Sequence, residues 1–344
     1  MRIFLGVDAG NTKTLAVAAT EDGAIIGSGR SGCGDIYGAS TPEEALANID
    51  GAVDVALESA GVARGDVCAA GCSLAGADWP EDYEYLYAKL AERGFPERCA
   101  IVNDGLGALR AGTADNVGVA VVCGTGAATG ARGVDGRSWH ASFWQVAGGG
   151  AYRLGFAAID AMLLAELGLA PSTVLTPRLL GHYGYDDVGK LLHDFSRRVD
   201  PMPRRADALA HLVLDAATEG DDVAREIVRS QAWDMGRIAV AAARKVGFDD
   251  SEFPLVLAGG VLRHESTVLA DDIVETVRDA GLGAVPVRSV LEPVVGALLL
   301  GFDKAGVDSV DSQFRSNLLR SMPDQALFHT KLQGTKPPSW IDNP

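Results

Sequence analysis

Three short glycine-bearing segments carry the residue types that bind phosphate. They are residues 8–14 (DAGNTKT), 123–126 (CGTG) and 257–261 (LAGGV). Glycine lets backbone N–H groups approach a phosphate closely, and nearby hydroxyl groups add further donors. Each segment follows an apolar, β-rich run, so each is predicted to be the tight turn that ends a buried strand. The sequence therefore predicts phosphate binding at three strand-end turns.

The three turns resemble the phosphate-1, phosphate-2 and adenosine motifs of the acetate and sugar kinase/Hsp70/actin superfamily. Within it, the chain most resembles the branch of N-acetylglucosamine kinases and BadF/BadG/BcrA/BcrD ATPases. The resemblance implies an α/β fold of two ribonuclease H-like (actin-like ATPase) domains, with ATP in an interdomain cleft. Further matching segments are residues 74–78 (LAGAD), 102–104 (VND), 151–155 (AYRLG) and 292–297 (EPVVGA).

The resemblance also implies roles for single residues. Asp8 ends the first strand and would hold Mg²⁺, which prefers a few carboxylates plus waters; the alternative is a carboxylate that caps the turn. Asp104 would be the general base that takes the proton of a sugar hydroxyl; the alternative is the N-cap of a helix that starts near Gly105. Lys13 would add charge at the phosphates or point to solvent. The expected nucleotide-binding residues are Gly10, Asn11, Thr12, Lys13, Thr14, Gly124, Thr125, Gly126, Gly259, Gly260 and Val261.

On the sugar side, the chain departs from the family pattern. Asp35 takes the place of an Asn that commonly follows the glycine-rich stretch after the third strand. Residues 146–150 read VAGGG where many relatives carry GDEGS, so both acids of that run are missing. This loss leaves the acceptor, and even the kinase activity, open. The expected substrate-binding residues are Asp35, Asp78, Asn103, Gly148 and Gly149.

Three functions fit this pattern. The first is an ATP-dependent kinase of an amino sugar such as N-acetylglucosamine or glucosamine, and it is favoured. The second is a partner-driving ATPase of the BadF type, and the third is a nucleotide- or sugar-binding protein that has lost turnover. Activators of radical dehydratases hold an iron–sulfur cluster with cysteines. Here Cys123 lies inside the second turn and no cysteine follows it, which disfavours the second function.

Composition limits the partners and the compartment. The net charge of −16 argues against nucleic acid and anionic membranes as partners. A strand-like run begins almost at the first residue and no apolar run could span a bilayer, so neither a signal peptide nor a membrane anchor is expected. The five cysteines form no CxxC pair, and reduced thiols in a cytoplasm are the simplest account. The resemblance further implies a homodimer.

Alternating strands and helices position these residues. The first hundred residues predict the order β-β-β-α-β-α-β, and a second set begins near residue 117 with a hairpin around the second turn. An Ala-rich helical middle follows, with one long helix at about 221–246, and then a closing β-α-β. The expected domains are 1–112 with a returning helix at about 294–306, and 113–293. The tail, 307–344, is expected to be poorly ordered or bound to a partner.

Overall fold

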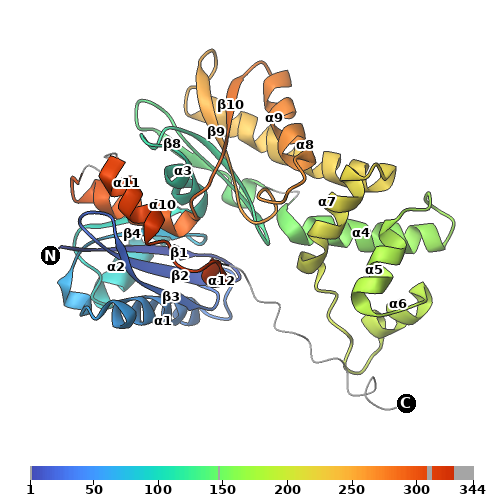
Figure 1. The fold of residues 1–344 in the computed structure, drawn as a ribbon, viewed down its shortest axis with the longest axis horizontal. Coiled ribbons are helices and arrows are strands. Elements are labelled where there is room, and N and C mark those ends of the chain that lie inside the picture. Colours follow the sequence, from blue (N-terminus) through green and yellow to red (C-terminus); the bar gives the residue numbers. More distant parts are fainter. Residues whose placement is uncertain (1, 146–147, 308–311, 329–344) are drawn as a thin grey trace. The chain divides into compact units, whose positions relative to one another are not determined.

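The computed structural model describes residues 2–145, 148–307 and 312–328. The chain forms two compact units. Unit 1 combines Met1–Gly107 with Glu292–Pro344, and unit 2 is Ala108–Leu291. Each unit contains one five-stranded sheet with both parallel and antiparallel neighbours (Figure 1), so the expected α/β class is confirmed.

The sheet of unit 1 has the order β3-β2-β1-β4-β5. β1, β4 and β5 run parallel, and their last residues lie in register, Ala9 beside Leu74 and Leu74 beside Asn103. Because parallel strands end at the same edge of a sheet, residues that follow these three strands gather at that edge. The strands are β1 (Ile3–Ala9), β2 (Thr14–Thr20), β3 (Ile25–Ser31), β4 (Val67–Leu74) and β5 (Cys99–Asn103).

Helices cover both faces of this sheet (Figure 1). Thr41 caps the first turn of α1 by accepting a hydrogen bond from the Glu44 N–H at 3.1 Å. α10 packs closely on the opposite face, where a Cβ at Gly6 would lie 2.6 Å from the Leu298 Cβ. The helices of unit 1 are α1 (Pro42–Ala60), α2 (Pro80–Glu92), α10 (Pro293–Lys304), α11 (Ser312–Arg320) and α12 (Gln325–Phe328), with a 3₁₀ turn at Arg64–Asp66. α3 (Asp104–Gly112) begins in unit 1 and ends in unit 2.

The sheet of unit 2 has the order β10-β9-β6-β7-β8. β6 and β9 are parallel neighbours, so Cys123 and Ala258 end their strands at the same edge. The strands are β6 (Gly118–Cys123), β7 (Ala127–Arg132), β8 (Ser138–His140), β9 (Glu252–Ala258) and β10 (Gly283–Arg288).

Helices make up most of the rest of unit 2. α8 is the long helix that the sequence predicts, and Asp221 caps it by accepting from the Ala224 N–H at 2.9 Å. Across the described residues, no helix combines the length and the apolar character needed to cross a membrane. The helices are α4 (Gly150–Glu166), α5 (Leu175–Tyr183), α6 (Val188–Ser196), α7 (Ala210–Thr218), α8 (Asp222–Lys245) and α9 (Val268–Asp279), with 3₁₀ turns at Ser142–Trp144 and Ala206–Leu209.

The described part of the segment after residue 307 contains the two helices α11 and α12. Within its described part, α11 buries Phe314 and Leu318, which lie one helical turn apart. Asn317 donates to the backbone carbonyl of Asp22 at 2.9 Å, in the turn between β2 and β3. The apolar pattern of α11 spans only about one turn, which is too short to stand out in the sequence. Residues 308–311 and 329–344 lie outside the described residues.

Candidate functional site

The shared strand edge of unit 1 brings Asp8 and Asp104 into each other's electrostatic field. The pKa of Asp8 is raised to about 6, mainly because of burial; Lys13 and a hydrogen bond with Ser73 oppose this increase, and the charge of Glu292 contributes to it. Burial also raises the pKa of Asp104 to about 7, and the charge of Asp8 adds to this increase. Both side chains keep part of their surface accessible. A ligand can therefore reach two carboxylates that titrate near neutral pH.

Asn103 arranges the start of the helix that carries Asp104. It is 2% exposed, and its amide oxygen accepts from the Gly105 N–H at 3.1 Å. Its amide nitrogen donates to Asp78 Oδ1, also at 3.1 Å. A hydrogen bond from the same Gly105 N–H lowers the pKa of Asp104. However, the residue that precedes α3 and caps it is Asn103. This geometry weakens the alternative in which Asp104 serves only as a helix cap.

Asp35 and Asp78 lie on the same side of unit 1 as the proposed base, since both raise the pKa of Asp104 through their charge. The Asp35 carboxylate is 7% exposed and accepts from the Tyr37 N–H at 2.9 Å. Burial raises its own pKa. Of the five predicted substrate-binding residues, the structure therefore gathers three, Asp35, Asp78 and Asn103, around Asp104.

Asp82 links two segments around Asp35 and Asp78, a role that was not predicted from the sequence. One carboxylate oxygen accepts from the Tyr37 hydroxyl at 2.9 Å, and the other accepts from the Trp79 N–H at 2.8 Å. It thereby links the loop that carries Asp35 to the start of α2. An acid three residues after the residue that precedes a helix is the second half of a capping box, so a signal was present at this position.

The first glycine turn is closed by its own backbone. The Gly10 N–H donates to the Lys13 carbonyl at 3.0 Å, which leaves Asn11 and Thr12 exposed at the tip. Thr14 differs from its expected role as a phosphate donor. It is fully buried, and its hydroxyl donates to the Gly32 carbonyl at 2.9 Å, so it supports the turn from behind.

Lys13 does not simply point to solvent. Its ammonium group donates to the backbone carbonyl of Phe328, the last described residue. Its charge also lowers the pKa of Asp8. The lysine therefore stands close enough to the carboxylate to influence its ionisation while contacting the C-terminal segment.

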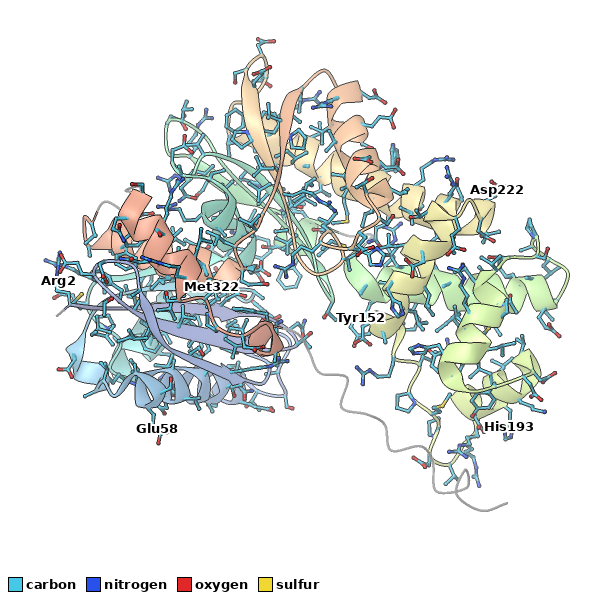
Figure 2. The ribbon with its side chains drawn as sticks, in the orientation of Figure 1. Arg2, Glu58, Tyr152, His193, Asp222 and Met322 are labelled. Atoms are coloured by element: carbon cyan, nitrogen blue, oxygen red, sulfur yellow. The ribbon has the colours of Figure 1, made fainter. Side chains whose placement is uncertain are left out.

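The second glycine turn is held by the start of α4. The Ala151 N–H donates to the Gly124 carbonyl at 2.8 Å, and the Tyr152 N–H donates to the Thr125 carbonyl at 3.2 Å. Tyr152 is labelled at this end of the helix in Figure 2. Gly150 has a φ of 83°, and a Cβ there would lie 2.5 Å from the Thr125 carbonyl oxygen. Only glycine permits this approach.

The glycine run before α4 has a structural reason as well. Gly148 has a φ of 65°, and a Cβ on Gly149 would lie 2.6 Å from the Ala127 Cβ. Gly149, within the run that replaces the two family acids, is therefore packed against the strand that follows the turn through Gly124–Gly126. Gly148 and Gly149 belong to unit 2, and their role in substrate binding stays a prediction; residues 146 and 147 lie outside the described residues.

The third turn packs against the same strand end as the second. The Val261 N–H donates to the Cys123 carbonyl at 3.0 Å. Gly259 has a φ of 96°, and a Cβ there would lie 2.6 Å from the Cys123 carbonyl carbon. Gly260 is exposed. Within unit 2, the structure thus brings the second and third turns together at Cys123.

Arg288 at the end of β10 fixes the segment that follows the third turn. Its guanidinium group donates to the carbonyls of Leu262 and His264, each at 3.0 Å. The sequence analysis missed this residue because its partners lie 26 and 24 positions away along the chain and are backbone atoms.

The donor chemistry around Asp8 fits Mg²⁺. Among the described residues, no three His, Cys, Asp or Glu side chains are grouped to hold a metal ion by themselves. Mg²⁺ does not require such a group, since it is usually bound by one or two carboxylates together with waters and substrate phosphates. A cation would also offset the unfavourable burial that raises the pKa of Asp8.

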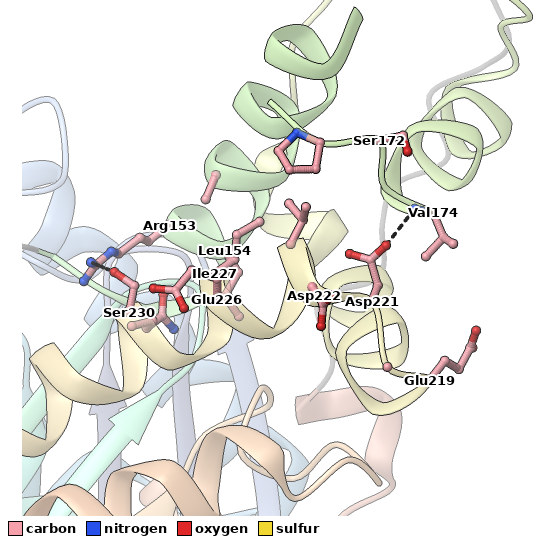
Figure 3. Close-up of a pocket in the computed structure, with 15 residues that line it drawn as sticks. Arg153, Leu154, Ser172, Val174, Glu219, Asp221, Asp222, Glu226, Ile227 and Ser230 are labelled. Atoms are coloured by element: carbon pink, nitrogen blue, oxygen red, sulfur yellow. Dashed lines mark hydrogen bonds between the residues drawn. The ribbon is translucent and has the colours of Figure 1, made fainter. Parts of the chain in front are cut away.

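A cavity of about 990 Å³ lies in the helical part of unit 2, apart from these turns (Figure 3). Arg153 of α4 forms one end, where it pairs with Asp234 at 2.6 Å, and Glu226 and Asp222 of α8 lie along one side. None of the predicted site residues lines this cavity. We therefore place the candidate site at the strand-end turns and not in this cavity.

Comparison with known proteins agrees with the motifs. An N-acetyl-D-glucosamine kinase of Dictyostelium discoideum is 26% identical over 322 residues, which cover 88% of this chain and 98% of that protein. An N-acetylmuramic acid/N-acetylglucosamine kinase of Clostridium acetobutylicum is 25% identical over 267 residues, with coverages of 77% and 87%.

Solved structures and a family model extend this agreement. A Chromobacterium violaceum protein provisionally described as an N-acetylglucosamine kinase has a TM-score of 0.64 and 26% identity, with 87% of this chain and 99% of that chain covered. The model of the BadF/BadG/BcrA/BcrD ATPase family matches residues 5–301. The chain therefore belongs to the BadF/BadG/BcrA/BcrD ATPase family.

Proposed function

We propose that the protein transfers the γ-phosphoryl group of ATP to a hydroxyl group of a small amino sugar, of the N-acetylglucosamine or glucosamine type. The observation that carries this proposal is the position of Asp104. It is a reachable carboxylate with a pKa of about 7, set among polar side chains and within the electrostatic field of Asp8, beside the first glycine turn. The curated relatives with kinase names support the same reaction class.

Asp104 acts as the general base. A catalytic base works best when its pKa lies near the working pH, because it is then both available and basic enough to accept a proton. A pKa of about 7 meets this condition, whereas an ordinary aspartate would be a much weaker base. Asp104 takes the proton of the sugar hydroxyl as that oxygen attacks the γ-phosphorus, and ADP leaves with the bridging oxygen.

Each unit carries glycine turns that are suited to bind parts of a nucleotide. Exposed backbone at Asn11 and Thr12 offers donors in unit 1, and the turn through Thr125 and Gly126 offers them in unit 2. The turn at Gly259 and Gly260 contacts the adenosine. Mg²⁺, held by Asp8 directly or through water, would neutralise charge that develops on the phosphates.

The acceptor is oriented by Asp35, Asp78 and Asn103. Ionised carboxylates only accept hydrogen bonds, whereas an amide both donates and accepts, so this set suits a ligand rich in hydroxyl groups. The Asn103–Asp78 hydrogen bond and the Tyr37–Asp82 hydrogen bond hold the set in place before a sugar binds. A preorganised set of this kind costs less ordering when the acceptor binds.

We also propose that the protein works in the cytoplasm as a homodimer. All five cysteines are free thiols, and the nearest pair, Cys72 and Cys99, has sulfur atoms 3.9 Å apart. A reducing compartment that contains ATP is consistent with this state.

A panel of sugars tests the function directly. We expect ADP formation that depends on an added amino sugar and that produces the matching sugar phosphate, detected by mass spectrometry. ATP hydrolysis that is independent of every sugar would instead support a partner-driving ATPase. Binding of ATP and sugar without turnover would support a protein that has lost catalysis, and either result would overturn the kinase proposal.

A further inference from the structure

The segment that follows α10 returns to the part of unit 1 that carries the first glycine turn. The family match ends at residue 301, and α11 and α12 come after it. α11 is anchored at the turn between β2 and β3 by Asn317, and its Phe314 ring packs edge-to-face on Phe302 of α10 with centroids 4.9 Å apart. The Ser321 hydroxyl accepts from the Ile25 N–H at 2.8 Å. These contacts fix the direction in which the chain continues.

Two backbone carbonyls of α12 then accept hydrogen bonds from cationic side chains. The Leu327 carbonyl accepts from Arg30 Nη1 at 2.9 Å, and the Phe328 carbonyl accepts from the Lys13 ammonium. The Phe328 ring is only 3% exposed, so the end of this segment is packed and not merely adjacent. Arg30 lies on β3, whereas Lys13 belongs to the first glycine turn.

The resemblance places the same ammonium group near the phosphates of ATP, where it would add charge. A backbone carbonyl is a neutral acceptor, whereas a phosphate oxygen is charged and forms a stronger hydrogen bond with a cation. A nucleotide can therefore draw Lys13 away from Phe328 at the cost of the packing around α12. Both contacts would use the ammonium group of one flexible side chain.

We propose that residues 312–328, the C-terminal strap, form an autoinhibitory segment that competes with a nucleoside triphosphate for Lys13. The proposal rests on the proposed function, because it assumes that the first glycine turn binds phosphate. When the strap is docked, the binding-competent fraction of the protein falls, and the apparent affinity for ATP falls by the same factor. The strap thus sets the ATP concentration at which the protein becomes active.

The unmodified chain supplies the first test, because chymotrypsin cleaves after Phe328 only when this residue is exposed. We expect a non-hydrolysable ATP analogue with Mg²⁺ to speed this cleavage, and adenosine, which has no phosphates, to leave it unchanged. Calorimetry on the same samples measures binding of the analogue. Binding without faster cleavage would overturn the strap proposal alone, whereas absence of binding would overturn the proposed function and the strap proposal with it.

A substitution in the strap supplies the second test. Phe328→Asp places a charge at a buried position and should release α12, so KM for ATP should fall by roughly three- to tenfold while kcat stays the same. Leu319→Ala, at an exposed position of α11, is the matched control and should change neither constant. In a Lys13→Met background, Phe328→Asp should have no further effect on KM. A rise in KM for Phe328→Asp would mean that the strap positions Lys13 for ATP, and would overturn the proposal.

Discussion

At the residue scale, Asp104 is distinguished from an ordinary helix-start aspartate by the charges around it. Asp8, Asp78 and Asp35 all raise its pKa, and Asn103 takes the capping position before the helix. Asp104→Asn keeps the size of the side chain but cannot accept the hydroxyl proton. We expect kcat for sugar-dependent ADP formation to fall by about 10²- to 10⁴-fold, with nucleotide affinity preserved. A variant with near-normal kcat would remove Asp104 from the role of base.

The pH dependence follows from the same pKa. The base must be deprotonated, so kcat/KM should rise as the pH increases through about 7. Asp78→Asn removes one negative charge that raises the pKa of Asp104, and the acidic limb of the kcat/KM profile should therefore shift to lower pH. Asp54→Asn, at an exposed position of α1, is the control and should leave the limb in place. An unshifted limb in Asp78→Asn would contradict the assignment of this limb to Asp104.

Stability gives an independent readout of Asp104. Because the pKa is higher in the folded chain than the ordinary value of 3.8, the folded state binds more protons between about pH 4 and pH 7. Stability contributed by this group is therefore lost as the pH rises through that range. Asp104→Asn should raise the melting temperature at pH 8, by a free energy on the order of 1 kcal/mol given the accessible surface of the side chain, and should not do so at pH 4. A lower melting temperature at pH 8 would indicate a structural role.

The residues that the sequence could predict are those at the end of a strand or directly after it. Asp8, Asp104 and the three glycine turns are visible because a buried apolar run precedes each of them. Asp82 links the Tyr37 hydroxyl to the start of its own helix, and Arg288 holds backbone carbonyls of another segment. The single sequence carries no mark of which carbonyl an arginine will reach. Thr14 is the opposite case. It lies inside a predicted phosphate motif, but its buried hydroxyl supports the turn instead of facing a ligand.

At the element scale, the start of α4 supports the second glycine turn, and Gly150 tests this contact. Gly150→Ala introduces both backbone strain, at a φ of 83°, and a clash with the Thr125 carbonyl. Gly184→Ala is the matched control in unit 2, since Gly184 has a φ of 76° and no atom within 4 Å of the added Cβ. Both variants should lose roughly 1–3 kcal/mol from strain.

Only the clash with the Thr125 carbonyl should affect nucleotide binding. We therefore expect Gly150→Ala to raise KM for ATP, whereas Gly184→Ala should lower the melting temperature without a change in KM. Equal effects of the two variants on KM would mean that α4 does not position the second turn for ATP.

Element order was accessible from the sequence, and element packing was not. Strand and helix positions follow from apolar periodicity and from caps such as Thr41 and Asp221. The strap was missed because α11 buries only Phe314 and Leu318, and because its anchors at Asp22 and Ile25 lie almost three hundred positions away. Long-range contacts of this kind depend on the folded sheet that receives them.

At the scale of the whole molecule, each unit repeats one arrangement. A mixed five-stranded sheet places its glycine turns after strands whose ends share one edge, β1 beside β4 in unit 1 and β6 beside β9 in unit 2. No sequence repeat reveals this duplication, so fold-level resemblance was needed to predict it. The nucleotide cleft that the resemblance implies stays a prediction.

Removal of the metal should abolish activity and leave the fold of the whole molecule unchanged. Asp8, the proposed Mg²⁺ ligand, lies at the end of β1 and keeps part of its surface accessible, so we expect the folded state not to depend on the metal. We expect EDTA to leave the melting temperature of the nucleotide-free protein unchanged, to abolish turnover, and to reduce the rise in melting temperature that ATP causes.

Asp8→Ala should reproduce the effect of EDTA, because burial raises the pKa of this carboxylate to about 6 and its ionised form therefore does not stabilise the fold. Nucleotide affinity should fall less than turnover, since backbone N–H groups of the glycine turns still hold the phosphates. Glu58→Ala on the exposed face of α1, labelled in Figure 2, is the control and should respond to EDTA as the unmodified protein does. If Asp8 only capped its turn, Asp8→Ala would cost roughly 1 kcal/mol of stability and leave Mg²⁺-dependent kcat intact. Melting and turnover measured on the same preparation distinguish these outcomes.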